Sequence, residues 1–337
     1  MSPQFVDFNS DGHLDIVAGI FDGSPHVAWG SDKGWKQPEQ ILDRADARIV
    51  LNNFWNFDAK KWDTTNRCDP AGQTLSGELL TSAFAWDWDA DGDLDLLLGD
   101  HTGGHVYLRM NEGAAGANLF ATQNVPVQAA GAALTVSGTV ATLCMVDWNR
   151  DGLMDLACGS MGDAYGSGKG GGVFVYLNTG TTGAPVFGLP LVLVAPSEKA
   201  SVGAAERPDS GLYMDFGDHD GDGDLDIVVG GYSHWTPKSP VLTSEQKSRV
   251  AELEAQASSL RAQLSALDVV IENAIKGLDE AATETKYQEL HAAQSEKREP
   301  IMEKITATGN ELGKLVPMPQ RTSCVWLYEN TSATPAR

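Results

Sequence analysis

The chain has 337 residues, a formal net charge of −22 at pH 7 and 42% hydrophobic residues. This length can bury a sizeable core, and the 36 glycines suit a turn-rich β fold. The negative charge argues against nucleic acid as a partner, because binding phosphates requires clustered Lys and Arg. We expect no transmembrane helix, since no apolar run approaches the length that spans a membrane, and no signal peptide is visible.

The most informative pattern is an acidic nine-residue segment that occurs four times. Each copy has Asp or Asn at positions 1, 3 and 5, Gly at position 6 and Asp at position 9. The copies begin at Asp7, Asp87, Asp147 and Asp218, and each runs into an apolar stretch that ends in glycine. Hard cations such as Ca²⁺ are bound by oxygen ligands, and glycine permits the sharp turn that gathers them. The repeats therefore predict four metal loops between strands.

This repeat resembles the FG-GAP/VCBS family, which includes integrin α-subunit propellers and many bacterial surface and secreted proteins. The resemblance implies a mainly β fold, namely a β-propeller of four or five blades with about four Ca²⁺ ions, one in each inter-strand loop. It implies ligation by the side chains at positions 1, 3, 5 and 9 and by the backbone carbonyl at position 7. The expected metal residues are Asp7, Asn9, Asp11, His13, Asp15, Asp87, Asp89, Asp91, Asp93, Asp95, Asp147, Asn149, Asp151, Leu153, Asp155, Asp218, Asp220, Asp222, Asp224 and Asp226.

Two of the loops depart from the all-Asp pattern at position 3, where Asn9 and Asn149 stand. Asn still offers an oxygen, but one negative charge is lost. We therefore expect loops two and four to bind Ca²⁺ more tightly than loops one and three. Because the unfolded chain lacks the site, the free energy of binding adds to the free energy of folding.

A second strand-like element follows each loop, and its aromatic, alternating residues are typical of a strand that ends in a turn. The copies are Val106–Asn111, Val173–Asn178 and Val325–Asn330, with a weaker copy at Val27–Trp29. Phe120 and Phe187, and Trp35 in the first unit, indicate an outer strand. Each unit then contains about four strands, as a propeller blade does.

Two stretches leave the architecture open. The segment 43–80 contains Trp55 and Trp62, and we expect either an extra strand pair or a long ordered loop there. After Asn330 the chain offers no outer strand for the fourth blade. The propeller is therefore an unusual four-bladed ring, a five-bladed ring with a degenerate unit, or an arc completed by another chain.

The fourth unit carries an insertion, because Asp226 and Val325 are 99 residues apart where the other units have 11 to 18. Apolar residues spaced three and four apart from Val250 to Leu278 indicate a coiled-coil seam. Thr243 and Gln246 fit a capping box at its start. After a break at Asp279–Thr283, a second helix returns through Tyr287 to Leu315, and Pro300 should kink or interrupt it.

We therefore assign residues 1–240 and 319–337 to the propeller and residues 241–318 to an inserted antiparallel helical coiled-coil hairpin. Three roles remain open for the hairpin. It is a plain structural spacer, a hairpin that folds on the propeller, or an arm for a protein partner or for self-association.

The cysteines and histidines give weaker signals. Four cysteines do not make a disulfide framework. Cys144 and Cys158 lie symmetrically about the third loop, so we expect them opposite each other on adjacent strands, either as buried thiols or as a disulfide. His101 and His105 flank a turn-like Thr-Gly-Gly, which favours exposed loop histidines over a pair of metal ligands.

These features favour a non-enzymatic, calcium-stabilised interaction or assembly module in an extracellular, periplasmic or cell-surface location, where millimolar calcium fills such sites. The expected partner is a protein or a second copy, bound through the coiled-coil arm. The resemblance also implies two alternatives, a polysaccharide-active enzyme of the lyase type and a carbohydrate-binding lectin, each acting at the propeller face. We find no order of catalytic residues that supports a named catalytic or cofactor site.

Overall fold

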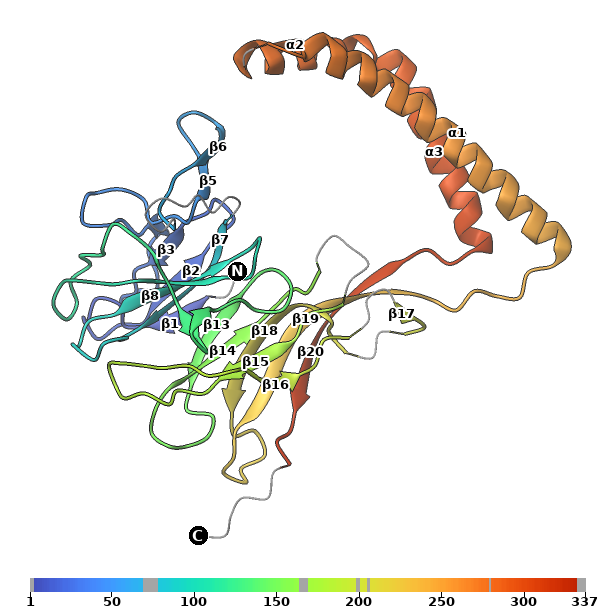
Figure 1. The fold of residues 1–337 in the computed structure, drawn as a ribbon. Coiled ribbons are helices and arrows are strands. Elements are labelled where there is room, and N and C mark those ends of the chain that lie inside the picture. Colours follow the sequence, from blue (N-terminus) through green and yellow to red (C-terminus); the bar gives the residue numbers. More distant parts are fainter. Residues whose placement is uncertain are drawn as a thin grey trace. The chain divides into compact units, whose positions relative to one another are not determined.

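The computed structural model describes residues 3–68, 78–163, 169–197, 201–204, 207–278 and 280–331. The chain forms two compact units. The first comprises Met1–Ser201, Ala205–Trp235 and Arg321–Arg337, and the second comprises Val202–Ala204 and Thr236–Gln320. The first unit consists of strands and the second is mainly helical (Figure 1). No helix in the described ranges is long and apolar enough to span a membrane.

The described residues of the first unit form four antiparallel sheets of four strands each, which follow one another along the chain and are called sheets 1 to 4, and two small two-stranded sheets. Sheet 1 consists of β1 (Gln4–Val6), β2 (Asp15–Gly19), β3 (Pro25–Ala28) and β4 (Glu39–Gln40). Sheet 2 consists of β7 (Leu80–Trp86), β8 (Asp95–Asp100), β9 (Val106–Arg109) and β10 (Val125–Pro126). Sheet 3 consists of β13 (Thr142–Val146), β14 (Asp155–Gly159), β15 (Val173–Tyr176) and β16 (Leu191–Val194).

Sheet 4 has a different make-up. It consists of β17 (Ser201–Val202), β18 (Ser210–Gly217), β19 (Asp226–Thr236) and β20 (Gln320–Tyr328). The long strand β19 pairs with all three others, and β20 has no other partner among the described strands. In sheets 1 to 3 a fourth strand covers the outer edge of the third. The described residues supply no such strand for β20, and the expectation that none follows Asn330 concerns residues that lie, apart from Thr331, outside the described ranges.

The second strand of an inner sheet is apolar at successive positions because both of its faces are buried. Leu96 and Leu98 of β8 belong to a core shared with sheet 1, whereas Leu97 belongs to a core shared with sheet 3. Consecutive sheets pack face to face, β2 against β7, β7 and β8 against β13, and β13 and β14 against β18. The described strands of sheets 4 and 1 do not pair with each other, so the structure shows no closed sheet.

The segment 43–80 contains an extra strand pair, which was one of the two expectations. The pair is β5 (Asn53–Asn56) and β6 (Lys61–Thr64), and residues 69–77 lie outside the description. The segment is held by the fully buried Arg109 of β9, whose Nε donates to Asn124 at 2.7 Å and whose Nη1 lies 3.7 Å from the Asp43 carboxylate. A second small hairpin joins β11 (Gln128–Ala129) and β12 (Ala132–Ala133).

The predicted outer-strand markers lie before the outer strands and not in them. Phe120 and Phe187 form isolated bridges with Asn111 and Asn178, at the end of each third strand. The outer strands β10 and β16 come a few residues later. The prediction of an outer strand in these units is therefore confirmed, but the prediction that Phe120 and Phe187 belong to that strand is wrong.

The cysteine prediction was wrong by one residue of register. Cys144 pairs with Ala157, and Cys158 pairs with Leu143. Neighbouring residues of a strand point to opposite faces, so the two thiols lie on opposite sides of sheet 3. Cys158 is buried in the core between sheets 2 and 3, and both cysteines are free.

The second unit contains three helices, α1 (Ser244–Ile275), α2 (Glu280–Ala293) and α3 (Ser295–Leu315), and α1 packs against both others. The capping box is confirmed, with the Thr243 hydroxyl accepting from the Gln246 amide and the Gln246 side chain accepting from the Thr243 amide. Ion pairs of Arg249 with Glu311 and of Arg298 with Asp268 show that α1 and α3 run antiparallel.

Two details of the helical prediction are wrong. The returning segment is interrupted at Gln294, and Pro300 lies inside α3. The break begins where α1 ends, at Ile275, earlier than predicted; Thr283 is already part of α2, and Asp279 lies outside the description. The seam is buried at Leu253, Ala257, Leu260 and Ile271. It lapses after Ile271, because Ala274 and Leu278 are exposed.

Candidate functional site

The four acidic loops occupy the same place in their sheets, between the first and second strands. They connect β1 to β2, β7 to β8, β13 to β14 and β18 to β19. The backbone follows the same path in each. Position 6 is a glycine with φ between 88° and 95°, and position 4 also has a positive φ, at Ser10, Ala90, Arg150 and Gly221. The sequence indicated the turn at position 6 through its repeated glycine. It did not indicate the left-handed backbone at position 4, because a different residue stands there in each loop.

Hydrogen bonds fold each loop around its own carboxylates. The position 1 Asp accepts from the amide of the position 6 glycine, at 2.9 to 3.2 Å in the four loops. The position 5 Asp accepts from the amide of position 7, at 2.9 to 3.0 Å. Backbone amides of the same loop therefore hold the carboxylates that would bind a cation.

The position 9 Asp is buried in every loop and ties three parts of the sheet together. One oxygen accepts from the amide of position 2, at 2.8 to 3.0 Å. The other accepts from the amide of the second residue after the third strand, at 2.6 to 2.9 Å. This residue is Gly30, Asn111, Asn178 or Asn330. The sequence indicated the strand-ending Asn but gave no sign of its bond to position 9.

Loops two and four bring their carboxylates together. Oxygens of Asp87, Asp89 and Asp95 lie within 4.8 Å of one another, as do oxygens of Asp218, Asp220 and Asp222. In loops one and three the position 3 amide turns instead to the position 5 carboxylate. Asn9 donates to Asp11 at 3.0 Å, and Asn149 donates to Asp151 at 2.9 Å.

Loops two and four also hold buried carboxylate oxygens without a well-formed hydrogen bond. Both side-chain oxygens of Asp93 and of Asp224, at position 7, are in this state, as is Oδ1 of Asp87. Burial and the charges of Asp91, Asp89 and Asp87 raise the pKa of Asp93 to about 6. Unpaired buried carboxylates are costly. A divalent cation would supply their missing partner, so the donor set fits a hard metal ion.

The side chain at position 7 is a feature that sequence reasoning missed, since only its backbone carbonyl was expected to bind. A signal existed, because position 7 is Asp in the two loops that are also all-Asp at positions 1, 3 and 5. In loop one this position is His13, 3.9 Å from Asp32, and in loop three it is Leu153.

The histidine pair does not form a metal group in the described residues. His105 Nδ1 lies 3.5 Å from Asp100, whose hydrogen bond raises the pKa of His105. His101 packs edge-on against Phe21, with ring centroids 5.5 Å apart, and burial lowers its pKa.

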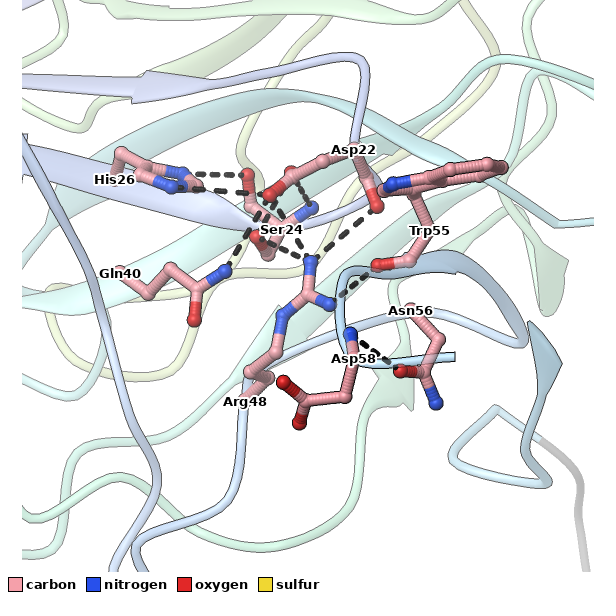
Figure 2. Close-up of polar contacts among 8 residues, drawn as sticks. All are labelled: Asp22, Ser24, His26, Gln40, Arg48, Trp55, Asn56 and Asp58. Carbon is pink, nitrogen blue, oxygen red and sulfur yellow. Dashed lines mark hydrogen bonds and ion pairs between the residues drawn. The ribbon is translucent and has the colours of Figure 1, made fainter. Parts of the chain in front are cut away.

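A polar cluster fastens the β5–β6 hairpin to sheet 1 (Figure 2). Arg48 donates to Asp22 Oδ2 at 3.0 Å and to the Trp55 carbonyl at 2.6 Å, and the Trp55 amide donates to the Asp22 carbonyl at 2.7 Å. The Ser24 hydroxyl donates to Asp22 Oδ1 at 2.8 Å, and His26 Nε2 lies 3.8 Å from Asp22. These bonds join the hairpin to the turn between β2 and β3, so the cluster acts as an anchor.

The anchored hairpin presents exposed aromatic rings beside sheet 1. We call Phe21, Phe57 and Trp62 the aromatic patch; their exposed fractions are 58%, 56% and 49%. Phe21 and Trp62 meet edge to face, with centroids 6.4 Å apart. Phe21 follows β2, whereas loop one precedes it, so the patch and the loop lie at opposite ends of that strand.

Comparison with known proteins agrees with this repeat geometry. The family model of FG-GAP-like repeats matches residues 87–158 and 147–229. The first match contains loops two and three, and the second contains loops three and four. No curated protein and no solved structure matches the chain. Residues 87–229 therefore contain two FG-GAP-like repeats, in agreement with the family resemblance of the sequence.

Proposed function

We propose that this protein is a calcium-stabilised, non-enzymatic interaction module that works outside the cytoplasm. The observation that carries the proposal is the set of buried, unpaired oxygens of Asp93, Asp224 and Asp87 in loops that are already folded by their own hydrogen bonds. Bound Ca²⁺ would be held by the carboxylates of each loop and would neutralise them. Calcium outside cells is abundant enough to fill such sites, whereas cytosolic calcium fills only tight ones.

Calcium titration followed by thermal unfolding tests this proposal. We expect Ca²⁺ to raise the melting temperature, and EDTA to lower it, because the ion binds the folded chain and not the unfolded one. Loops two and four should fill before loops one and three. A melting temperature that ignores both Ca²⁺ and EDTA would reject the proposal.

The non-enzymatic part is supported by a cavity of about 710 Å³ between the first strands of the sheets. Its ionisable lining residues include Cys144, Tyr213 and Asp215. Burial raises the pKa of Cys144 to about 12 and also raises that of Tyr213. A nucleophile or base needs a pKa near the working pH, so the Cys144 thiol and the Tyr213 hydroxyl are poorly suited to catalysis.

The helical unit is proposed as a coiled-coil arm for a protein partner or for self-association. Exposed apolar residues remain on α1 and α2, at Val269, Val270 and Tyr287, after the seam is formed. Deleting residues 241–318 should remove binding of that partner while calcium still raises the melting temperature of the remaining chain. A partner bound equally well without the arm would contradict this role.

A second candidate function, carbohydrate binding, is favoured by the aromatic patch. Phe21 and Trp62 meet edge to face and each stays about half exposed, so together they offer apolar ring surface to a sugar. Oligosaccharides of neutral sugars should quench tryptophan fluorescence in the native chain, and Trp62→Ala should remove the effect. Trp35→Ala, which changes an exposed tryptophan outside the patch, is the matched control.

A further inference from the structure

Sheets 1 to 4 carry an equivalent glycine at the fifth residue of the second strand. They are Gly19, Gly99, Gly159 and Gly230. In the first three, an added Cβ would lie 2.7, 2.1 and 2.2 Å from backbone atoms of Ser82, Ala141 and Leu212, which belong to the next sheet or lead into it. These glycines therefore let the next sheet approach closely.

Gly230 has the same place in sheet 4 but a different neighbourhood. The nearest atoms to an added Cβ are the Tyr213 carbonyl at 3.9 Å and Val325 Cγ2 at 4.0 Å, both within its own sheet. Its φ is not in the left-handed region, so the backbone does not require glycine. Beside it, Val325 of β20 has an exposed fraction of 70%. Sheet 4 thus keeps the feature that receives a following sheet. The space beside it is the cavity of about 710 Å³, which is lined by Gly230 and Val325 and also by Gln4 and Phe5 of β1 in the same chain.

Sheet 1 shows the complementary feature. Phe120 and Phe187 are buried because the position 2 ring of the preceding loop packs on each, Phe8 at 6.1 Å and Trp88 at 6.0 Å. Trp35 holds the equivalent place, since the Lys36 amide donates to the Trp29 carbonyl as the Ala121 amide donates to the Met110 carbonyl. No described sheet precedes sheet 1, and Trp35 has an exposed fraction of 54%.

We propose that sheet 4 of one copy of this chain packs against sheet 1 of a second copy, head to tail. The contact would continue the series that joins sheets 1 to 2, 2 to 3 and 3 to 4. The strand β1 of the second copy would lie against Gly230 and Val325, and its Trp35 would lie against loop four. The proposal concerns a face of the strand unit and goes beyond the role of the helical arm.

His219, at position 2 of loop four, is suited to a surface that is exposed in a single chain and covered when two copies associate. Phe8, Trp88 and Trp148 hold this position in the other loops, whereas loop four has His219. A polar ring can contact Trp35 across the interface and also keeps the end sheet soluble in a single chain, as terminal repeats require. Because the two contacting surfaces differ, the interface is heterologous.

A heterologous interface can be tested by complementation, using the full chain in calcium-containing buffer and light scattering after size-exclusion chromatography. Native protein should show a mass that increases with concentration. Gly230→Val blocks the sheet 4 face, and Trp35→Glu blocks the sheet 1 face, so each variant alone should associate at least about tenfold more weakly. An equimolar mixture should regain a dimer, because one intact face of each kind remains.

Controls separate this interface from loss of folding and from the arm. Gly230→Val should keep the native melting temperature, because the site has room for the side chain, whereas Gly99→Val should lower it. Should Gly230→Val misfold, Val325→Glu serves as the second sheet 4 variant. Native protein that stays monomeric at the highest soluble concentration would overturn the proposal. Association that persists in both sheet 4 variants, or that vanishes only on deleting residues 241–318, would also overturn it.

Discussion

Asp95 and Asn111 join the second acidic loop to a strand that follows it in the chain. Asp95 Oδ1 accepts from the backbone N–H of Asn111 at 2.7 Å, while its Oδ2 accepts from the Trp88 amide at 2.9 Å. The same two bonds recur at the position 9 Asp of every loop. Position 9 therefore supports the fold before any ion binds, and its bonds reach the end of the third strand, whereas the bonds of positions 1 and 5 stay within the loop.

Replacing this residue should cost more stability than replacing an exposed carboxylate of the same loop. Asp95→Ala removes two charge-assisted hydrogen bonds from buried surroundings and should lower the free energy of unfolding by about 3 kcal/mol or more. Asp91→Ala changes an exposed side chain and should cost about 1 kcal/mol or less. Urea unfolding in EDTA measures both, and equal losses would contradict the assignment.

Asp93→Asn should change stability in opposite directions with and without calcium. In EDTA the substitution removes a buried, unpaired charge, so the melting temperature should rise. In saturating Ca²⁺ it removes a proposed ligand charge, so calcium should stabilise the variant less than the native protein. Asp58→Asn, at an exposed turn outside the loops, is the control. A variant that is less stable in both conditions would argue that Asp93 supports the fold itself.

The Asp100–His105 pair predicts a pH dependence. Burial alone would raise the pKa of Asp100, but hydrogen bonds from His105 and from nearby backbone amides lower it. The pKa of His105 is raised above its ordinary value of 6.5. A raised folded pKa means that the stabilisation is complete below the unfolded value and is lost as pH rises through the folded value.

The free energy of unfolding should therefore fall as the pH is raised from about 6.5, the ordinary histidine pKa. His105→Gln should flatten this part of the profile. Urea unfolding at a series of pH values, in saturating Ca²⁺ so that the acidic loops stay ionised, measures the slope. If the free energy of unfolding of the variant falls with pH as steeply as that of the native protein, the Asp100–His105 pair is not the cause of the pH dependence.

Replacing Arg109 should cause a large loss of stability, part of which a second substitution at Asp43 should recover. Its guanidinium is fully buried, lies 3.7 Å from Asp43 and donates to the Ala121 carbonyl at 2.6 Å. Arg109→Met leaves Asp43 as an uncompensated buried charge, which should cost about 3–5 kcal/mol. Adding Asp43→Leu should recover part of this loss in a double-mutant cycle. Additive losses would show that the two charges do not depend on each other.

The sequence alone determined the features that depend on local geometry. Alternate acidic residues with glycine at position 6 predicted the four turns. Glycine allows the left-handed backbone of a sharp turn, and such a turn brings the carboxylate oxygens of the alternate residues together. Apolar spacing and the pair of Thr243 with Gln246 predicted the long first helix and its start, because helix periodicity and capping act within a few residues.

Only the tertiary structure decided the features that depend on distant partners. It paired Cys144 with Ala157, joined Asp95 to Asn111 and buried Asp93 without a partner. It also left Trp35 exposed where Phe120 is covered, although both residues are aromatic and follow a third strand. The reason is physical: a turn or a helix is stabilised by its own neighbours, whereas burial and register depend on which sheet packs against which.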